Sequence, residues 1–284
     1  MNRNGSQAPF WARFLLIFLA LAVAGVLLLA PLLNVLAGAF SRGVGRYVGA
    51  LADPNTVHAI LLTVFVAGIA VAVNTVFGVA ASWAIAKYSF PGKSLLVTLI
   101  DLPFSVSPVI SGLLFVLLFG AESVLGRWLE ARGLQVLFAP PGIVLATIFV
   151  TFPFVAREVL PLMEAVGSDQ EEAAVTLGAT GWQAFRYVTL PNVRWGVLYG
   201  VLLCTARAMG EFGAVSVVSG RITGQTDTLS LRVDKLDQEY QTQAAFAVAS
   251  LLLVCALATL LAKNFLEWKL RRALEEAARP PETP

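Results

Sequence analysis

Charged residues are scarce in this chain, and they avoid its long apolar segments. Only 13% of the 284 residues are charged, about half the share of an ordinary soluble domain. Of the 20 basic and 18 acidic residues, only Arg207 and Glu211 fall inside such a segment. This segregation excludes an ordinary soluble enzyme, a disordered chain and a nucleic-acid-binding protein. The apolar segments are 14–41, 59–86, 102–121, 133–156, 195–220 and 240–262.

Histidine and cysteine are almost missing as well. The chain has one histidine, His58, and two cysteines, Cys204 and Cys255, both in apolar segments. These few residues cannot form a Cys/His zinc cluster or a disulfide framework. No nucleophile, base and metal set is recognisable, which excludes an intramembrane enzyme. The net charge of +2 implies no polyanionic partner.

Each apolar segment is long enough to cross a bilayer as a helix, because about 20 apolar residues suffice. We therefore predict an all-α membrane protein with six transmembrane helices and both termini on one side. Twelve Lys and Arg residues, Arg157 among them, would lie on the side of the termini and seven on the other. The positive-inside rule then places both termini in the cytoplasm. The third segment contains Pro103 and Pro108, so we expect a kinked or partly unwound start.

Three parts of the chain are expected from this pattern. Residues 1–56 would form an N-terminal anchor helix and the first periplasmic loop, and 57–263 a five-helix core. Residues 264–284 would form a cytoplasmic tail at the lipid headgroups.

The longest cytoplasmic connection, residues 157–194, contains two predicted helix starts. Ser168–Glu171 and Thr180–Gln183 both have the pattern of a capping box. Gly178 is placed to end the first helix, and Leu190-Pro191 is expected to stop the second. The segment is thus predicted to be a helix, a glycine turn and a short helix.

The short second helix would carry Trp182, Phe185 and Val188 at helical spacing. Two interpretations of such an aromatic surface remain open from the residues alone. It could lie on lipid headgroups, or it could dock into a groove of a cytoplasmic partner.

A sequence motif in this loop is typical of one family. Glu172-Ala173-Ala174, three residues, Gly178, nine residues and Val188-Thr189-Leu190-Pro191 follow in order. This resembles the EAA loop of the membrane subunits of type I ABC importers, with Val188 in place of isoleucine. In that family the loop is a coupling helix that inserts into an ATPase subunit. The resemblance therefore implies the following coupling residues: Glu172, Ala173, Ala174, Gly178, Trp182, Phe185, Leu190 and Pro191.

The resemblance also implies what the chain itself does not supply. Gly92-Lys93-Ser94 lacks the earlier glycine of a P-loop and precedes an apolar segment rather than following a strand. We therefore expect no cofactor in this chain, no catalysis by it, and ATP bound on the partner subunits. The implied partners are two ATPase subunits, a second permease subunit, a periplasmic binding protein and membrane lipid, with no nucleic acid. The implied location is the bacterial inner membrane.

Further motifs narrow the resemblance to permeases for tetrahedral oxyanions. Arg207–Gly213 and Asp101–Val109 are similar to segments of the sulfate, thiosulfate and molybdate permeases. The continuation through Ser219-Gly220-Arg221 to Ala244-Ala245-Phe246 most resembles the W-type subunit of sulfate/thiosulfate importers. That likeness implies a T-type partner subunit and a sulfate-binding protein. The T-type subunit itself and the molybdate permease remain alternatives, as does an ATP-independent anion channel or secondary carrier.

Span five supplies a physical reason to look for an anion path. Arg207 lies about midway along 195–220, where a charge is costly, and Glu211 follows one turn later. The two could line the path, because a guanidinium binds oxyanions well, or could simply lock helices together. Ser105 and Ser107 flank the proline-broken start of span three and are weaker path candidates, since they could instead satisfy free backbone groups.

Overall fold

The described part of the chain consists of helices and connecting loops. A computed structural model describes residues 10–277, and no strand occurs within that range. The first half contains α1 (Phe10–Ala24), the π-helix η1 (Gly25–Leu29), α2 (Ala30–Phe40), α3 (Val44–Leu51), α4 (Pro54–Lys87), α5 (Lys93–Ser105), α6 (Pro108–Phe119) and α7 (Val124–Glu130). The second half contains α8 (Pro140–Thr151), α9 (Pro153–Val166), α10 (Asp169–Thr176), α11 (Gly181–Ala184), the π-helix η2 (Phe185–Thr189), α12 (Leu190–Met209), α13 (Gly213–Val218), α14 (Leu229–Gln238) and α15 (Thr242–Ala277).

Four helical stretches of residues 10–277 are long and apolar enough to cross a bilayer on their own. They are Trp11–Phe40, Pro54–Lys87, Pro140–Val166 and Thr242–Leu266. The pair α5 and α6 is a fifth candidate, but the two helices are bent by 110°. The prediction of a helical membrane protein is confirmed. The predicted fifth span, 195–220, is not among these candidates: α12 ends at Met209 and the chain leaves helical geometry before α13.

Two of the helix boundaries that differ from the sequence prediction concern charged residues. The third span begins at Lys93 rather than at residue 102, so Asp101 lies inside α5. The fourth continues to Val166 rather than ending at 156, so Arg157 lies inside α9 and not in the loop. The two charges pair with each other: Arg157 Nε donates to Asp101 Oδ1 at 2.8 Å, with both side chains partly exposed.

The core of the bundle is formed by α4, α9 and α12. Small residues allow the backbones to approach closely: a Cβ on Gly78 of α4 would lie 2.9 Å from Val155 Cβ, and one on Gly200 of α12 would lie 3.0 Å from Val155 Cα. The buried Asn74 of α4 also donates to Oγ1 of Thr151, the last residue of α8, at 2.8 Å. The three helices therefore pack as one unit.

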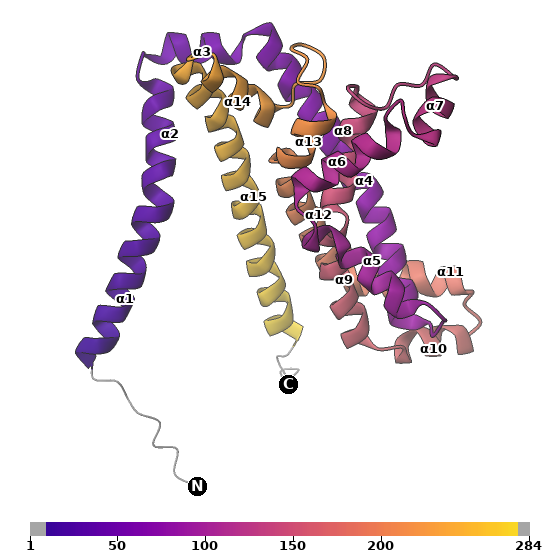
Figure 1. Ribbon diagram of the computed structural model, residues 1–284. Coiled ribbons are helices and arrows are strands. Elements are labelled where there is room, and N and C mark those ends of the chain that lie inside the picture. Colours follow the sequence, from indigo (N-terminus) through magenta and orange to yellow (C-terminus); the bar gives the residue numbers. More distant parts are fainter. Residues whose placement is uncertain (1–9, 278–284) are drawn as a thin grey trace.

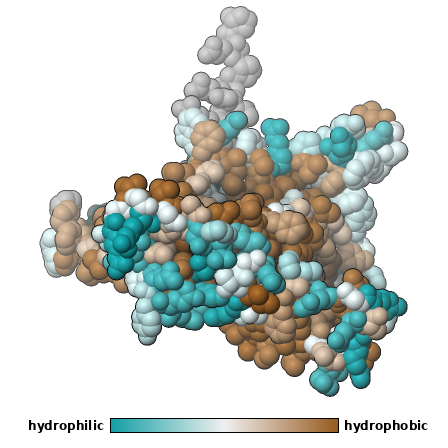
Figure 2. All heavy atoms as spheres, turned by 90° about the horizontal axis from the view of Figure 1, so that it is seen from above, coloured by the Kyte–Doolittle hydropathy of each residue, from teal (hydrophilic) through white to brown (hydrophobic). Residues whose placement is uncertain are grey.

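Figure 1 shows how the elements divide between the two ends of the bundle. The helices α10 and α11 lie at the lower end, together with the start of α1 and the end of α15, whereas α3, α7 and α14 lie at the upper end. The stretch from α1 to α2 stands apart from the bundle, and no part of its apolar window is buried. Seen from above, hydrophilic side chains gather over the upper end against an apolar body (Figure 2).

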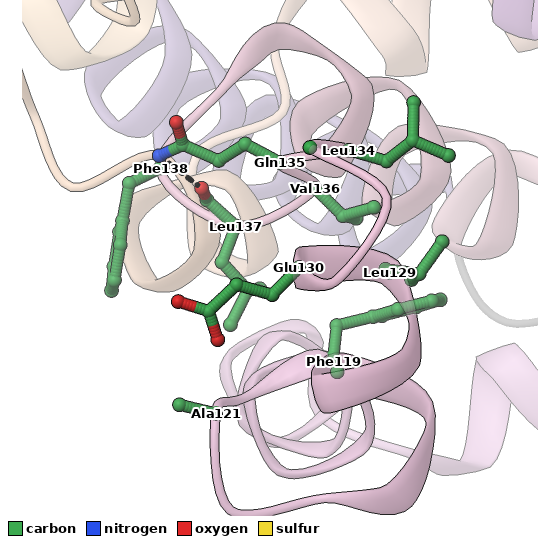
Figure 3. A pocket seen from close by; sticks show the side chains of 11 residues that line it. Phe119, Ala121, Leu129, Glu130, Leu134, Gln135, Val136, Leu137 and Phe138 are labelled. Carbon is green, nitrogen blue, oxygen red and sulfur yellow. Dashed lines mark hydrogen bonds between the residues drawn. The ribbon is translucent and has the colours of Figure 1, made fainter.

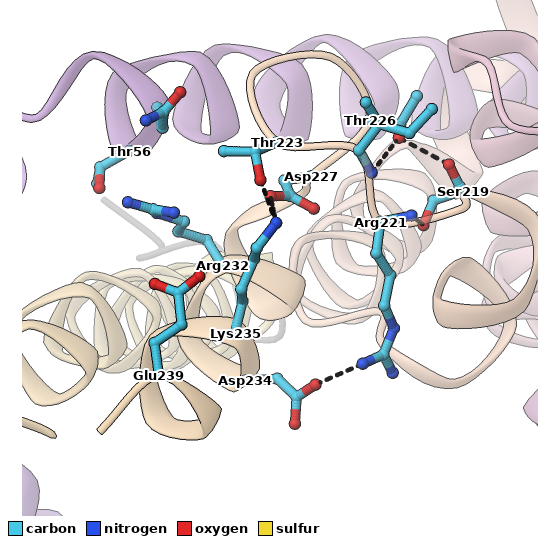
Figure 4. Close-up of polar contacts among 12 residues, drawn as sticks. Thr56, Ser219, Arg221, Thr223, Thr226, Asp227, Arg232, Asp234, Lys235 and Glu239 are labelled. Atoms are coloured by element: carbon cyan, nitrogen blue, oxygen red, sulfur yellow. Dashed lines mark hydrogen bonds and ion pairs between the residues drawn. The ribbon is translucent and has the colours of Figure 1, made fainter. Parts of the chain in front are cut away.

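A polar network fixes α14 to the start of α4 at the upper end. Asp53 caps α4 by accepting from Asn55 N and Thr56 N, and its Oδ1 also accepts from Arg232 Nη2 at 3.1 Å. Arg221 pairs with Asp234 of α14 at 2.9 Å (Figure 4). Elsewhere at the upper end, α7 and the loop after it line a hollow of about 410 Å³ (Figure 3).

Candidate functional site

The loop between α9 and α12 begins with a helix whose first turn is acidic. Asp169, Glu171 and Glu172 occupy that turn of α10. The predicted capping box is wrong, however, because the Ser168 side chain makes no cap hydrogen bond. The Glu171 carboxylate turns instead toward the bundle, where it pairs with Lys87 Nζ at 3.1 Å and accepts from the Thr189 hydroxyl.

This ion pair joins the loop to the transmembrane bundle. Lys87 is the last residue of α4, and its side chain is only 7% exposed. Its ammonium also donates to the carbonyl oxygen of Gly167, at the end of α9. Lys87 therefore connects α4, α9 and α10 through two contacts. Sequence reasoning missed it, because a lysine at the cytoplasmic end of a span is ordinarily attributed to the positive-inside pattern.

Gly178 ends α10 in a Schellman motif, as the sequence indicated. Its φ of +94° is in the left-handed region. Ala179 N donates to Ala174 O at 3.0 Å, and Gly178 N donates to Val175 O at 2.9 Å. Nothing lies within 4 Å of the place where a Cβ would stand. The glycine is thus required for backbone conformation and not for space.

The second predicted capping box is present. Thr180 Oγ1 accepts from Gln183 N at 3.3 Å, and Gln183 Oε1 accepts from Thr180 N at 2.8 Å. The prediction that Leu190-Pro191 stops this helix is wrong. The chain instead passes from α11 through the π-helix η2 directly into α12. The wider turn places Pro191 in the first turn of α12, where its missing N–H is not needed.

The loop exposes apolar side chains at the lower end of the molecule. Leu177 is 90% exposed, Tyr187 70% and Trp182 65%. Phe185 points inward, with its ring centroid 4.8 Å from that of Trp83 in α4. Val188 and Leu190 are half-buried, and Pro191 is exposed.

The small residues of the motif differ in exposure. Ala173 is exposed, whereas Ala174 is half-buried. A hollow of about 490 Å³ between α10 and η2 is lined by Glu172, Phe185 and Lys87, among others. Sequence reasoning missed Leu177 and Tyr187 as exposed apolar residues. The available signal was Leu177 itself, a large apolar residue beside the helix-ending glycine.

Arg207 and Glu211 form the expected ion pair, but not in the middle of a helix. Arg207 lies in the last turn of α12, and Glu211 lies in the break before α13. Arg207 Nη1 and Glu211 Oε2 are 2.7 Å apart, with the Arg207 side chain one-third exposed and the Glu211 side chain 1% exposed. Glu211 Oε1 also accepts from Ala214 N at 2.9 Å. The carboxylate thus satisfies a free backbone donor at the start of α13.

A second break separates α5 from α6, and here the expected disruption is larger than a kink. The chain turns at Val106-Ser107, three to four residues after Pro103 inside α5. Ser105 and Ser107 are both exposed, and Ser107 makes no side-chain cap for α6. Pro108 begins α6, so the first free N–H groups of that helix belong to the next two residues.

The break between α12 and α13 lies against the break between α5 and α6. A Cβ on Gly213, at the start of α13, would lie 2.9 Å from Pro108 Cβ at the start of α6. One on Gly112 would lie 2.7 Å from the carbonyl oxygen of Ala214. The structure therefore places the segment that carries Glu211 beside the segment that carries Ser107. Irregular backbone at membrane depth is tolerated where it is buried in protein or lines a water-filled cavity.

Apolar spanning helices, two adjacent helix breaks and an exposed amphipathic loop at one end define a multi-pass membrane permease. Residues 74–272 match the model of the binding-protein-dependent transport system inner membrane component, and the chain belongs to that family. The predicted resemblance to type I ABC-importer membrane subunits is confirmed.

Individual relatives agree with this family. The chain is 49% identical over 277 residues to the sulfate transport system permease protein CysW of Escherichia coli strain K12, covering 98% of this chain and 95% of the relative. It is 36% identical over 247 residues to CysT of the same strain, covering 87% and 89%. A bacterial alginate ABC transporter in complex with a pentasaccharide-bound periplasmic protein contains a chain of the same fold. The TM-score is 0.75 at 18% identity, covering 93% of this chain and 95% of the other.

Proposed function

We propose that the chain is the W-type membrane subunit of an ATP-driven sulfate/thiosulfate importer of the bacterial inner membrane. The greater identity to CysW than to CysT, 49% against 36%, supports the W-type over the T-type assignment. The observation that carries a transport role is the meeting of two helix breaks around a partly exposed arginine. The preference among sulfate, thiosulfate and molybdate has to be measured, because a guanidinium binds tetrahedral oxyanions of similar shape and charge.

In this proposal the chain crosses the membrane six times. The bent pair α5 and α6 would count as one span and α12, which is about 30 Å long at 1.5 Å per residue, as another. Arg157 lies within a span in the structure, so it no longer counts toward either side. Eleven Lys and Arg residues then lie on the side of the termini and seven on the opposite side. This still favours cytoplasmic termini. The end that carries α10 and α11 would then face the cytoplasm (Figure 1).

The cytoplasmic loop would dock into an ATPase subunit. Leu177, Trp182 and Tyr187 supply an exposed apolar surface of the kind that a helix-binding groove covers. Two ATPase subunits, one under this chain and one under a T-type permease partner, would complete the complex, with ATP bound on those subunits alone. The assembled complex would hydrolyse ATP, and this chain would be its non-catalytic membrane subunit. The upper end, with α7 and α14, would face the periplasmic sulfate-binding protein.

Arg207 would attract the dianion at the level of the two breaks. Only one of its nitrogens pairs with Glu211, so further N–H donors are left for a tetrahedral oxyanion. The uncapped start of α6 adds a partial positive charge nearby. Glu211 would keep the arginine from retaining the anion. The competing interpretation is a structural pair that only locks α12 to α13.

The test is uptake of labelled sulfate by proteoliposomes that contain the full complex and its binding protein. Arg207→Ala is expected to abolish uptake while the complex still assembles. The double variant Arg207→Met/Glu211→Gln removes both charges and so leaves no unpaired carboxylate. Uptake by this double variant at the wild-type rate would refute the path role. Stimulation by a molybdate-loaded binding protein alone would refute the sulfate assignment.

A further inference from the structure

Two helices, α12 and α15, bring basic and aromatic side chains together at the lower end of the molecule. Lys269 Nζ of α15 lies 5.9 Å from the ring centroid of Trp195 in α12, and the guanidinium carbon of Arg194 lies 5.4 Å from the same ring. One turn further along α12, the ring centroid of Tyr199 lies 5.3 Å from Lys263 Nζ. Such distances are those of cation–π contacts. The basic-aromatic surface consists of Arg194, Trp195, Tyr199, Lys263 and Lys269.

The helix ends place this surface at the membrane boundary. The candidate span in α15 ends at Leu266, three residues after Lys263 and three before Lys269. At 1.5 Å per residue, each lysine is therefore about 5 Å from the end of the span along the helix axis. Arg194 is four residues past the start of α12 at Leu190. The end of α15 lies at the same end of the molecule as α10 and α11 (Figure 1). Tryptophan, tyrosine and basic residues all favour this level.

Among the side chains that the structure describes, two of the three cations of this surface form no ion pair. They are Arg194 and Lys269. Lys263 is attracted by the Glu158 carboxylate of α9 and so counts as partly neutralised. The sequence extends the excess of positive charge, with four basic residues and one acidic residue over 263–272. The surface therefore fits an anionic group.

The neighbouring surface above the cations fits lipid chains. Every exposed residue of α15 between 254 and 262 is apolar, with Leu257 44%, Leu260 50% and Leu261 67% exposed. Leu198 of α12 is 45% exposed. An amphiphile with an anionic head at the level of the cations and acyl chains along these leucines covers both parts, whereas a free inorganic anion leaves the apolar part uncovered.

A helix of a partner subunit is a poorer occupant of this place. In the proposed orientation this is the cytoplasmic end of the bundle. A partner helix that ends at the same level usually carries Lys or Arg there, which would bring like charges together. Anionic phospholipids supply the opposite charge, and basic pockets between transmembrane helices on the cytoplasmic side bind such headgroups.

We propose that the basic-aromatic surface binds the headgroup phosphate of an anionic phospholipid of the cytoplasmic leaflet. The phosphate would accept hydrogen bonds from the Arg194 guanidinium and the Lys269 ammonium. The bound lipid would hold α15 against α12 beside the bundle, outside the anion path. The proposal uses the proposed orientation of the chain but does not depend on which anion is transported.

The test is a titration of phosphatidylglycerol into the purified complex in a non-ionic detergent, with the bound lipid counted by native mass spectrometry. Each basic residue near an anionic lipid headgroup contributes about fivefold in affinity, so Arg194→Gln/Lys269→Gln is expected to weaken phosphatidylglycerol binding by about 30-fold. Binding of phosphatidylcholine, which has no net charge, should not change. Arg42→Gln, which removes an exposed arginine after α2 at the other end of the molecule, is the control and should alter neither.

Three results would overturn the proposal. The first is wild-type affinity of the double variant for phosphatidylglycerol. The second is displacement of phosphatidylglycerol by millimolar inorganic phosphate, which would make this a site for a free anion. The third is loss of a partner subunit from the double variant, or an equal fall of its Tm with either lipid, which would show that these contacts only join helices or subunits. None of these measurements involves sulfate, so they are independent of the uptake assay that tests the proposed function.

Discussion

Substitutions of Gly178 distinguish two effects that would weaken the docking of the permease to its ATPase, namely backbone strain and added negative charge. The φ of +94° imposes a conformational cost on any side chain, and the open space around the position imposes no steric one. A left-handed residue costs about 1–2 kcal/mol, less for asparagine and aspartate and more for a β-branched residue. We therefore expect Gly178→Asn to have little effect and Gly178→Val to weaken docking about 5- to 30-fold.

Gly178→Asp completes the series as a matched partner of Gly178→Asn. The two side chains have the same shape, but the aspartate adds a charge beside a loop that already carries Glu172 and Asp169 in its first turn. A larger loss with Asp than with Asn would show that charge at the docking surface matters beyond backbone strain. The measurement is the dissociation constant of the ATPase subunit for the permease pair, together with the sulfate transported per ATP hydrolysed. Equal affinities for the Asn and Val variants would refute the conformational argument.

Two further predictions concern packing and the loop connection. Lys87→Met should leave the Glu171 carboxylate without its cation and destabilise the loop by about 1–3 kcal/mol; transport per ATP should fall although the spans stay assembled, and Lys87→Met/Glu171→Gln should recover most of it. Gly112→Val should push α6 away from Ala214 and cost about 1–3 kcal/mol, seen as a lower Tm of the purified complex. Gly68→Ala, where nothing lies within 4 Å of the added Cβ, is its control and should not lower the Tm.

The loop was predictable from the sequence because its determinants are local. A glycine that must adopt a positive φ and a Thr-x-x-Gln capping box act over four residues, so the pattern that specifies them is contiguous. The failure at Ser168 has a tertiary cause. Glu171 would complete that box, but it is drawn to Lys87, which lies more than 80 residues earlier in the chain. No local pattern records such a partner.

The helix boundaries were less predictable, because hydropathy detects apolar residues and not helix ends. Asp101 and Arg157 interrupted the apolar pattern, and so each was placed at the edge of a span. In the structure each lies inside a helix, and the two pair with each other, because a charged residue does not by itself end a helix. The same applies to α12: an apolar segment of 26 residues, 195–220, reads as one span, although Gly210 and Glu211 divide it.

The cations of the three ion pairs that sequence reasoning missed or misplaced lie on one packed unit, whereas their acidic partners lie outside it. Lys87 ends α4, Arg157 lies in α9 and Arg207 lies in α12. These three helices approach closely at Gly78, Val155 and Gly200, and Val159, Met163 and Cys204 are buried in the same cluster. A rigid unit transmits a displacement at one end to its whole length. A displacement of the loop held by Lys87 would therefore move Arg207 relative to the broken pair α5 and α6. Under the proposed function, a movement of the loop by the ATPase and a change at the Arg207–Glu211 pair would then be one displacement rather than two separate events.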